Sequence, residues 1–170
     1  MPLLTHQLSA DVSDGLLTFS VEGLRDEGAT CPAQGVVNEP GKATDFVILG
    51  YAYPFGISDR AQDAFARAGL TGWTTRALVL RGWRSPSYAA LVVTGRCGSL
   101  DWTQSTAVEK LGKWTRYRGL NPERPNSVDD FCLPEGYNSI LVTEAVADCV
   151  SREGLTGCEC VPLDEAIAIR

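Results

Sequence analysis

Few residues in this chain have the type and spacing that catalysis requires. His6 is the only histidine among the 170 residues, so a serine or cysteine nucleophile would have to use it as its base. Cys97 follows Arg96, and a neighbouring guanidinium group can lower the pKa of a thiol. The adjacent carboxylates of Asp129 and Asp130 could transfer protons or hold a hard cation. Loop carboxylates commonly face water, and the glycines around Cys97 also suit a tight turn, so we expect no catalytic residue.

The six cysteines favour packing over disulfides or zinc. The N-terminal residues lack a basic region followed by an apolar run, so we expect no secretory signal and a cytoplasmic location, where thiols stay reduced. Cys158 and Cys160 are closer in sequence than an ordinary zinc knuckle allows, although both side chains would point to one face of a strand. We expect no metal and no cofactor. The sequence leaves open whether this pair binds a metal or forms disulfides.

Composition predicts one globular domain without a membrane segment. Hydrophobic residues make up 44% of the 170 residues, which is enough for one core. No apolar run approaches the length of about 18 residues that a membrane-spanning helix needs. We therefore exclude an integral membrane protein from the expected classes.

The net charge of −6 is distributed unevenly along the chain. Residues 76–118 carry eight Lys or Arg against two Asp or Glu, while the segments before and after are acidic. Tryptophans and tyrosines interrupt this basic segment, as in surfaces that bind nucleic acid or other anions. The acidic whole argues against nucleic acid as the partner. Arginines at alternate strand positions also commonly pair with carboxylates across a sheet.

A pattern repeated after 85 residues describes the elements that would position these side chains. Gly-Leu-Thr-Gly occurs at 69–72 and again at 154–157, and each copy follows a helical pattern that begins at Ser58 or Thr143. These two residues are expected to cap the helix N-termini with their hydroxyl groups. The first glycine of each motif is expected to end its helix in the left-handed conformation.

The repeat also predicts which residues are structural. Ala64 and Cys149 occupy equivalent positions on the apolar stripe of each helix, so Cys149 is expected to be a small packing residue. Apolar runs before and after each helix predict strands. We therefore predict an α+β fold with two related strand–helix–strand units, about 45–81 and 139–163, packed with additional, mostly antiparallel strands.

The domain organisation follows from the same repeat. We expect a single domain over residues 1–170, which could consist of two duplicated halves, 1–85 and 86–170, that share one core. Glycines and prolines predict a long loop over residues 25–44, and residues 119–138 are expected to be irregular. Residues 103–112 predict a short helix, with a loop as the alternative.

The second copy resembles a known protein family. Leu141 to Val146, followed by Gly154 to Gly157 and by Val161 to Leu163, resembles the C-terminal signature of bacterial immunity proteins from polymorphic toxin systems. The most similar is the immunity family usually numbered eleven, which is common in myxobacteria. Ser58 to Gly72 is similar to that family's N-terminal copy. The resemblance covers about a third of the chain, its motifs are structural, and the first copy lacks the proline found at Pro162 in the second.

The resemblance implies a small cytoplasmic protein that binds one cognate toxin and neutralises it without catalysis. Many such toxins are basic nucleases, towards which an acidic partner is steered. Because loops commonly carry recognition, acidic residues in irregular segments are the expected toxin-binding residues. They are Asp26, Glu27, Asp129, Asp130 and Glu135.

Two alternatives remain open at the level of sequence. One is a small enzyme or ligand-binding domain that uses Cys97 or the loop of Asp129 and Asp130. The other is an anion- or nucleic-acid-binding module that uses the basic segment 76–118. Nothing in the sequence predicts the oligomeric state.

Overall fold

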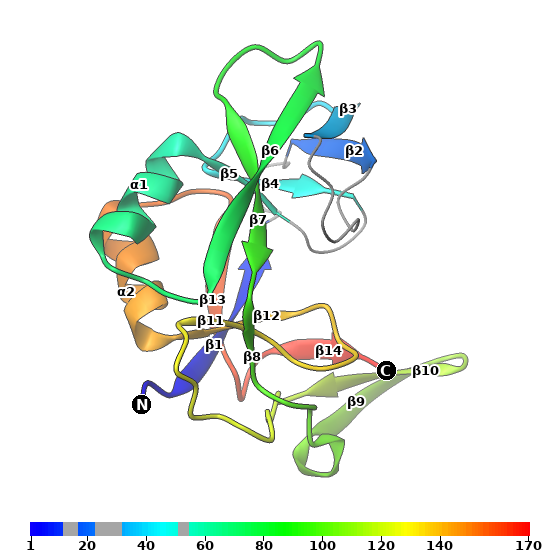
Figure 1. Cartoon of the computed structure of the whole chain (residues 1–170). Helices are drawn as coiled ribbons and strands as arrows, with labels where there is room; N and C mark the ends of the chain where they lie inside the picture. Colours follow the sequence, from blue (N-terminus) through cyan, green and yellow to red (C-terminus); the bar gives the residue numbers. More distant parts are fainter. Residues whose placement is uncertain (12–16, 23–31, 51–54) are drawn as a thin grey trace.

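Two α-helices and a large amount of β-structure in the described residues make this an α+β fold. The computed structural model describes residues 1–11, 17–22, 32–50 and 55–170. Helices α1 (Asp59–Arg67) and α2 (Glu144–Glu153) pack against each other on one side of the strands (Figure 1). Within the described residues, no helix combines the length and the apolar composition needed to cross a bilayer.

The strands form three sheets. A closed barrel has the order β2–β3–β6–β7–β5–β4, a five-stranded sheet has the order β13–β1–β12–β11–β8, and a three-stranded sheet has the order β14–β10–β9. The strand bounds are β1 Leu4–Ala10, β2 Thr18–Glu22, β3 Ala33–Glu39, β4 Phe46–Leu49, β5 Phe55–Ser58, β6 Trp73–Arg81, β7 Tyr88–Val93, β8 Gly95–Arg96, β9 Thr106–Leu111, β10 Trp114–Arg118, β11 Phe131–Leu133, β12 Ile140–Thr143, β13 Cys158–Pro162 and β14 Ile167–Ile169.

The two copies of the repeat are interlocked through an exchange of strands. Strand β7 belongs to the second half of the chain, residues 86–170, yet it pairs with β5 and β6 of the first copy. Strand β1 belongs to the first half, yet it pairs with β12 and β13 of the second copy. The order β4–β5–β7–β6 therefore recurs as β11–β12–β1–β13. The registers also agree, since Phe46 lies opposite Ile57 and Phe131 opposite Val142.

The helix ends confirm the predicted left-handed glycines. Gly69 has φ of +66° and Gly154 has φ of +57°. Three residues after the end of α1, the Leu70 N–H donates to Phe65 O at 3.1 Å, and two residues after the end of α2 the Leu155 N–H donates to Val150 O at 3.0 Å. These bonds satisfy carbonyl groups that the helix ends would otherwise leave free.

The predicted N-caps differ between the copies. Ser58 Oγ accepts from the Ala61 N–H at 3.2 Å, as predicted. The prediction is wrong for Thr143, whose side chain makes no capping bond to its helix. Its hydroxyl group instead donates to Asp130 Oδ1 at 2.8 Å.

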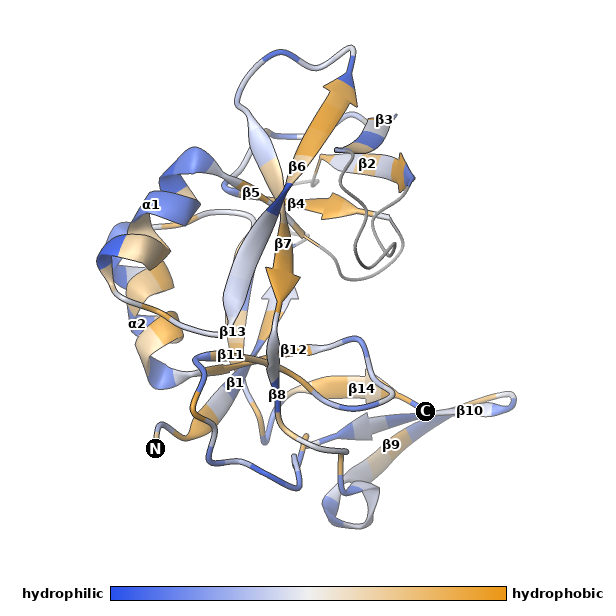
Figure 2. Ribbon diagram, in the orientation of Figure 1, coloured by the Kyte–Doolittle hydropathy of each residue, from blue (hydrophilic) through white to orange (hydrophobic). Residues whose placement is uncertain are grey.

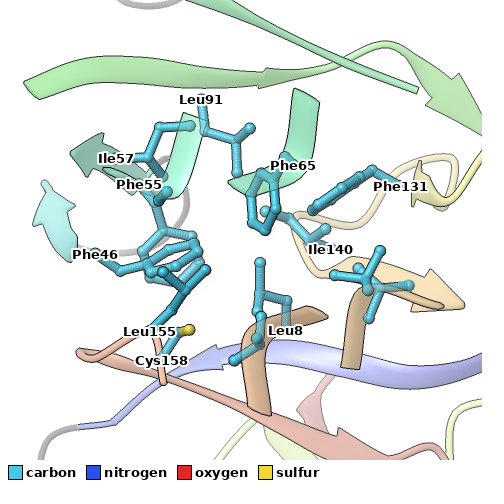
Figure 3. Packing of buried hydrophobic residues seen from close by; sticks show 14 of the residues in the cluster. Leu8, Phe46, Phe55, Ile57, Phe65, Leu91, Phe131, Ile140, Leu155 and Cys158 are labelled. Carbon is cyan, nitrogen blue, oxygen red and sulfur yellow. The ribbon is translucent and has the colours of Figure 1, made fainter. Parts of the chain in front are cut away.

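The largest core cluster lies between the two copies (Figure 3). It contains Phe46 and Phe65 from the first half and Phe131 from the second, and the Phe65 ring centroid lies 5.1 Å from that of Phe131. Ala64 and Cys149 meet where the two helices pack, and the Cys149 thiol donates to Ala64 O at 3.7 Å. Both side chains are buried, which confirms the placement of Cys149 as a packing residue.

Three predicted segments differ from the structure. Strand β3 lies inside the predicted loop 25–44, and β11 lies inside the predicted irregular segment 119–138. The predicted helix 103–112 is wrong, because β9 occupies Thr106–Leu111. Gly112, with φ of +62°, forms with Lys113 a two-residue turn that pairs β9 with β10.

Candidate functional site

Cys97 is placed in the core and cannot act as an exposed nucleophile. Its side chain is completely buried beside Cys132. Burial raises the pKa of Cys97 to about 12, and Arg96 lowers it only weakly. The Arg96 guanidinium group is bound to two backbone carbonyl groups, Val93 O at 3.0 Å and Gly95 O at 2.9 Å. The thiol is therefore protonated at neutral pH and has no path to a substrate.

The histidine and the two C-terminal cysteines that the sequence suggested for catalysis or metal binding also have partners within the fold. His6 lies on β1, and its Nδ1 is hydrogen bonded to Thr5 Oγ1 at 2.8 Å. Cys158 is buried in the main core and Cys160 packs against it, so the two side chains do share one face. All five cysteines in the described ranges are free thiols, and those ranges hold no cluster of His, Cys, Asp or Glu that suits a metal ion.

Asp130 is a structural residue that joins the two copies. Its Oδ2 accepts from the N–H of Thr71 at 2.9 Å and from the Thr71 hydroxyl group at 3.2 Å. Its Oδ1 accepts from the hydroxyl group of Thr143 at 2.8 Å. The carboxylate thus connects the Gly-Leu-Thr-Gly motif of the first copy to the start of α2 in the second. Both oxygens have partners inside the fold.

Asp45 makes the same set of contacts with the copies reversed. Its Oδ2 accepts from the N–H of Thr156 at 3.0 Å and from the Thr156 hydroxyl group at 3.2 Å. Its Oδ1 accepts from Ser58 Oγ at 2.8 Å, at the start of α1. Asp45 and Asp130 are therefore equivalent residues, and we call these two sets of contacts the aspartate clasps.

The last glycine of each motif allows the clasps to close. A Cβ atom on Gly72 would overlap the backbone oxygen of Phe131, and one on Gly157 would overlap that of Phe46. Each glycine also has a positive φ, +81° for Gly72 and +84° for Gly157. The threonine and the last glycine of Gly-Leu-Thr-Gly thus serve contact between copies, which explains why the motif occurs twice.

The remaining acidic candidates are distributed over different environments. Asp129 is half-buried, and its Cβ lies against Gly72 and Gly95. Glu135 is exposed, and its N–H donates to Gly98 O at 2.8 Å. Asp26 and Glu27 lie outside the described residues. Among the described acidic candidates, Glu135 is therefore the one whose side chain is exposed to a partner.

The predicted basic segment does not form one surface. Arg76 and Arg81 lie on β6 of the barrel, whereas Arg116 and Arg118 lie on β10 at the opposite end of the molecule (Figure 1). Arg81 donates to Gln34 at 2.7 Å, and Arg116 donates to Glu109 at 2.8 Å. The basic residues that are close together in the sequence thus lie in two separate regions of the structure.

Five of the ten exposed large apolar side chains among the described residues lie on the three-stranded sheet, which was not among the sites predicted from the sequence. One face of this sheet packs on the core through Ala168 and through Tyr117, whose ring lies 5.3 Å from that of Trp102. The opposite face, here called the outer sheet face, bears five large apolar side chains that are 37% to 51% exposed. They are Val108, Leu111, Trp114, Ile167 and Ile169.

The strand register places cations on the same face. Arg116 lies opposite Ile169 and Arg118 lies opposite Ile167, so their side chains share one side of the sheet. Figure 2 shows the hydrophobic strand β14 beside the more hydrophilic β10. A shallow open groove of about 680 Å³ is lined by Arg116, Arg118 and the residues of β14, together with Val108, Glu109 and Tyr137.

The outer sheet face has the composition of an interaction surface. An exposed apolar patch with polar groups around it is typical of protein interaction sites. A period-2 alternation in β14 was the signal in the sequence, but three residues are too few to distinguish a strand from a loop. The chain matches no family model and no curated protein, so the resemblance to immunity proteins stays a prediction.

Proposed function

We propose that this protein is a cytoplasmic immunity protein that binds a cognate toxin and neutralises it by protein–protein contact. The observation that carries this proposal is the outer sheet face. Large and exposed apolar side chains and two arginines lie there, and of the residues that line its groove only Tyr137 comes from outside the sheet. Such a surface suits a protein partner better than a small substrate. The resemblance of both copies of the repeat to an immunity family adds support.

The buried thiols weaken the enzyme alternative. Cys97 was its best nucleophile, and that thiol is completely buried. The loop of Asp129 and Asp130 was its second candidate, and both Asp130 oxygens accept hydrogen bonds within the fold. A role in binding accounts for the exposed sheet without requiring chemistry from these residues.

We also infer that the two strand–helix–strand units arose by duplication. They are β5–α1–β6 and β12–α2–β13, and the clasp residues Asp45 and Asp130 are separated by the same 85 residues as the rest of the pattern. Chance recurrence of a helix ending would not reproduce side-chain contacts made between copies. The duplication explains the scaffold and leaves the outer sheet face as the part with a separate role.

The proposal is tested with the product of the neighbouring upstream gene. We expect that product to be toxic when expressed alone in a bacterial host, and co-expression of this protein to restore growth. The two purified proteins should form a stable complex in size-exclusion chromatography. A product that is not toxic, or one that is toxic but neither bound nor neutralised, would contradict the proposal.

A further inference from the structure

We infer that the outer sheet face binds an apolar patch of the toxin that carries a carboxylate, placed opposite Arg118 and beside the ion pair of Arg116 and Glu109. This inference rests on the proposed function, because the partner is the toxin. It differs from the sequence-based expectation, in which acidic loops of this protein bind a basic surface. Here the positive charge lies on this protein and the negative charge on its partner.

The charge of the face comes from two arginines on one strand. Arg116 and Arg118 are alternate residues of β10, so their Cα atoms are about 7 Å apart on the same side of the sheet. Arg116 shares its charge with Glu109, 2.8 Å away. Across the described ranges, no ion pair involves Arg118. The face therefore carries an unmatched positive charge, although the whole chain has a net charge of −6.

The apolar side chains make the contact a protein interface. Ile167 and Ile169 lie beside the arginines on β14, and Trp114 lies at the far end of β10, 51% exposed. Lys113 places its ammonium group 5.1 Å from the Trp114 ring centroid. Tryptophan and arginine are the residue types that contribute most to binding energy in protein interfaces. Arg118 would form a bidentate contact with a carboxylate, and the apolar residues would exclude water around it.

Charge argues against two other occupants. A second copy stacked on this face would have to offer a carboxylate to Arg118, and Glu109, the carboxylate of the groove, is already paired with Arg116. A nucleic acid would have to cover isoleucines, and the cations on the face are too few for a phosphate backbone. A protein surface with a carboxylate matches both the charges and the apolar residues.

The test compares two matched double charge reversals. Arg116→Glu with Arg118→Glu changes the outer sheet face, and Arg81→Glu with Arg84→Glu makes the same change in charge on the barrel. We expect the first variant to bind the upstream gene product at least about 100-fold more weakly in calorimetry, since charges now repel across the interface. The barrel variant should bind within about threefold of wild type. Circular dichroism and thermal unfolding check that both variants fold.

Two further variants identify the chemistry of the contact. Arg116→Lys with Arg118→Lys keeps the charge and should retain most of the binding, with a loss of about tenfold because lysine lacks the bidentate geometry. Glu123→Lys with Glu135→Lys reverses two exposed acidic residues that do not belong to the three-stranded sheet and should leave binding unchanged.

Each outcome decides between the two proposals. Wild-type binding that survives Arg116→Glu with Arg118→Glu would overturn the inference and leave the immunity function standing. Loss of binding in Glu123→Lys with Glu135→Lys alone would move the interface to the acidic surface. Failure of the wild-type protein to bind the toxin would overturn both. Binding of a labelled oligonucleotide at low salt that requires Arg116 and Arg118 would replace the protein partner with nucleic acid.

Discussion

The two copies of the repeat share a scaffold but differ in how the neighbouring β-hairpin packs. In the first half, β2 and β3 pair with β4 and β6 and close a barrel. In the second half, the hairpin of β9 and β10 pairs with β14, and one face of the resulting sheet stays open. The helices and the aspartate clasps are equivalent. The comparison separates residues that hold the copies together from residues that are available to a partner.

The shared part is also slightly asymmetric. Arg60 donates to Asp45 at 2.6 Å and to the carbonyl groups of Glu153 and Gly154, at the end of α2. A cation is favourable there because the C-terminus of a helix carries partial negative charge. The second copy has Ala145 at the equivalent position, so this contact is made once. The clasp of Asp45 is therefore the stronger of the two.

The largest expected effect comes from the glycines at the clasps. Gly72→Ala and Gly157→Ala should each lower the free energy of unfolding by about 3 kcal/mol or more, because the new Cβ would overlap a backbone carbonyl group of the other copy. Gly69→Ala is the control, since its φ is positive but no atom lies within 4 Å of the added Cβ. It should cost about 1 kcal/mol in urea denaturation. Equal losses would mean that the glycines serve only backbone conformation.

The next effect distinguishes the two clasps. Asp45→Ala should cost about 3 kcal/mol, since it removes a buried carboxylate with an ion pair and leaves Ser58 and Thr156 without their acceptor. Asp130→Ala should cost about 1 to 2 kcal/mol, because Asp130 is more exposed and lacks the ion pair. Urea denaturation measures both. A larger loss for Asp130→Ala would contradict the proposed order.

Local signals in the sequence predicted the elements, and non-local pairing decided their arrangement. The glycines that end α1 and α2 and the packing role of Cys149 follow from residues a few positions apart. The exchange of β1 and β7 between copies does not, since strand pairing over such distances leaves no local pattern. The interpretation of 103–112 as a helix failed for a different reason, because all six residues of β9 are exposed and no alternation of buried and exposed positions marks the strand, although its partner β10 follows after only two residues.

Asp130 shows what the repeat could have revealed. Its position in an acidic loop suggested exposure, but its partner Thr71 lies 59 residues away in sequence. The signal was present, since Asp45 precedes Asp130 by the offset of the repeat. Residues that recur with a repeat are expected to be structural, and this rule removes Asp130 from the candidate site. The outer sheet face has no counterpart in the first copy, so the repeat could not identify it.

The two halves also differ in their cysteines, since all five described thiols lie in the second half. Burial raises the pKa of Cys97 to about 12 from its usual value near 9. The folded state thus favours the neutral thiol. The contribution of this preference to the free energy of unfolding is fully present below pH 9 and is lost as the pH rises towards 12. Cys97→Ala should therefore reduce the loss of stability between pH 7.5 and pH 10 by about 1.4 kcal/mol.

The control for this measurement lies in the first half. Val47→Ala creates a similar defect in the barrel core without removing a thiol. It should lower the free energy of unfolding at both pH values and leave their difference unchanged. If Cys97→Ala and wild type show the same alkaline loss, the Cys97 thiol does not contribute to it.

The smallest effect on stability is expected at the outer sheet face. Ile167→Asp should change the free energy of unfolding by less than about 1 kcal/mol, because its side chain is 40% exposed and packs against no covering element. Val37→Asp, on β3 of the hairpin that closes the barrel, should cost about 2 kcal/mol or more, since Val37 packs against the barrel core. Thermal and urea unfolding of the two variants compare the open three-stranded sheet with the closed barrel. A large loss for Ile167→Asp would mean that this face supports the fold, and its exposed isoleucines would then need no partner to explain them.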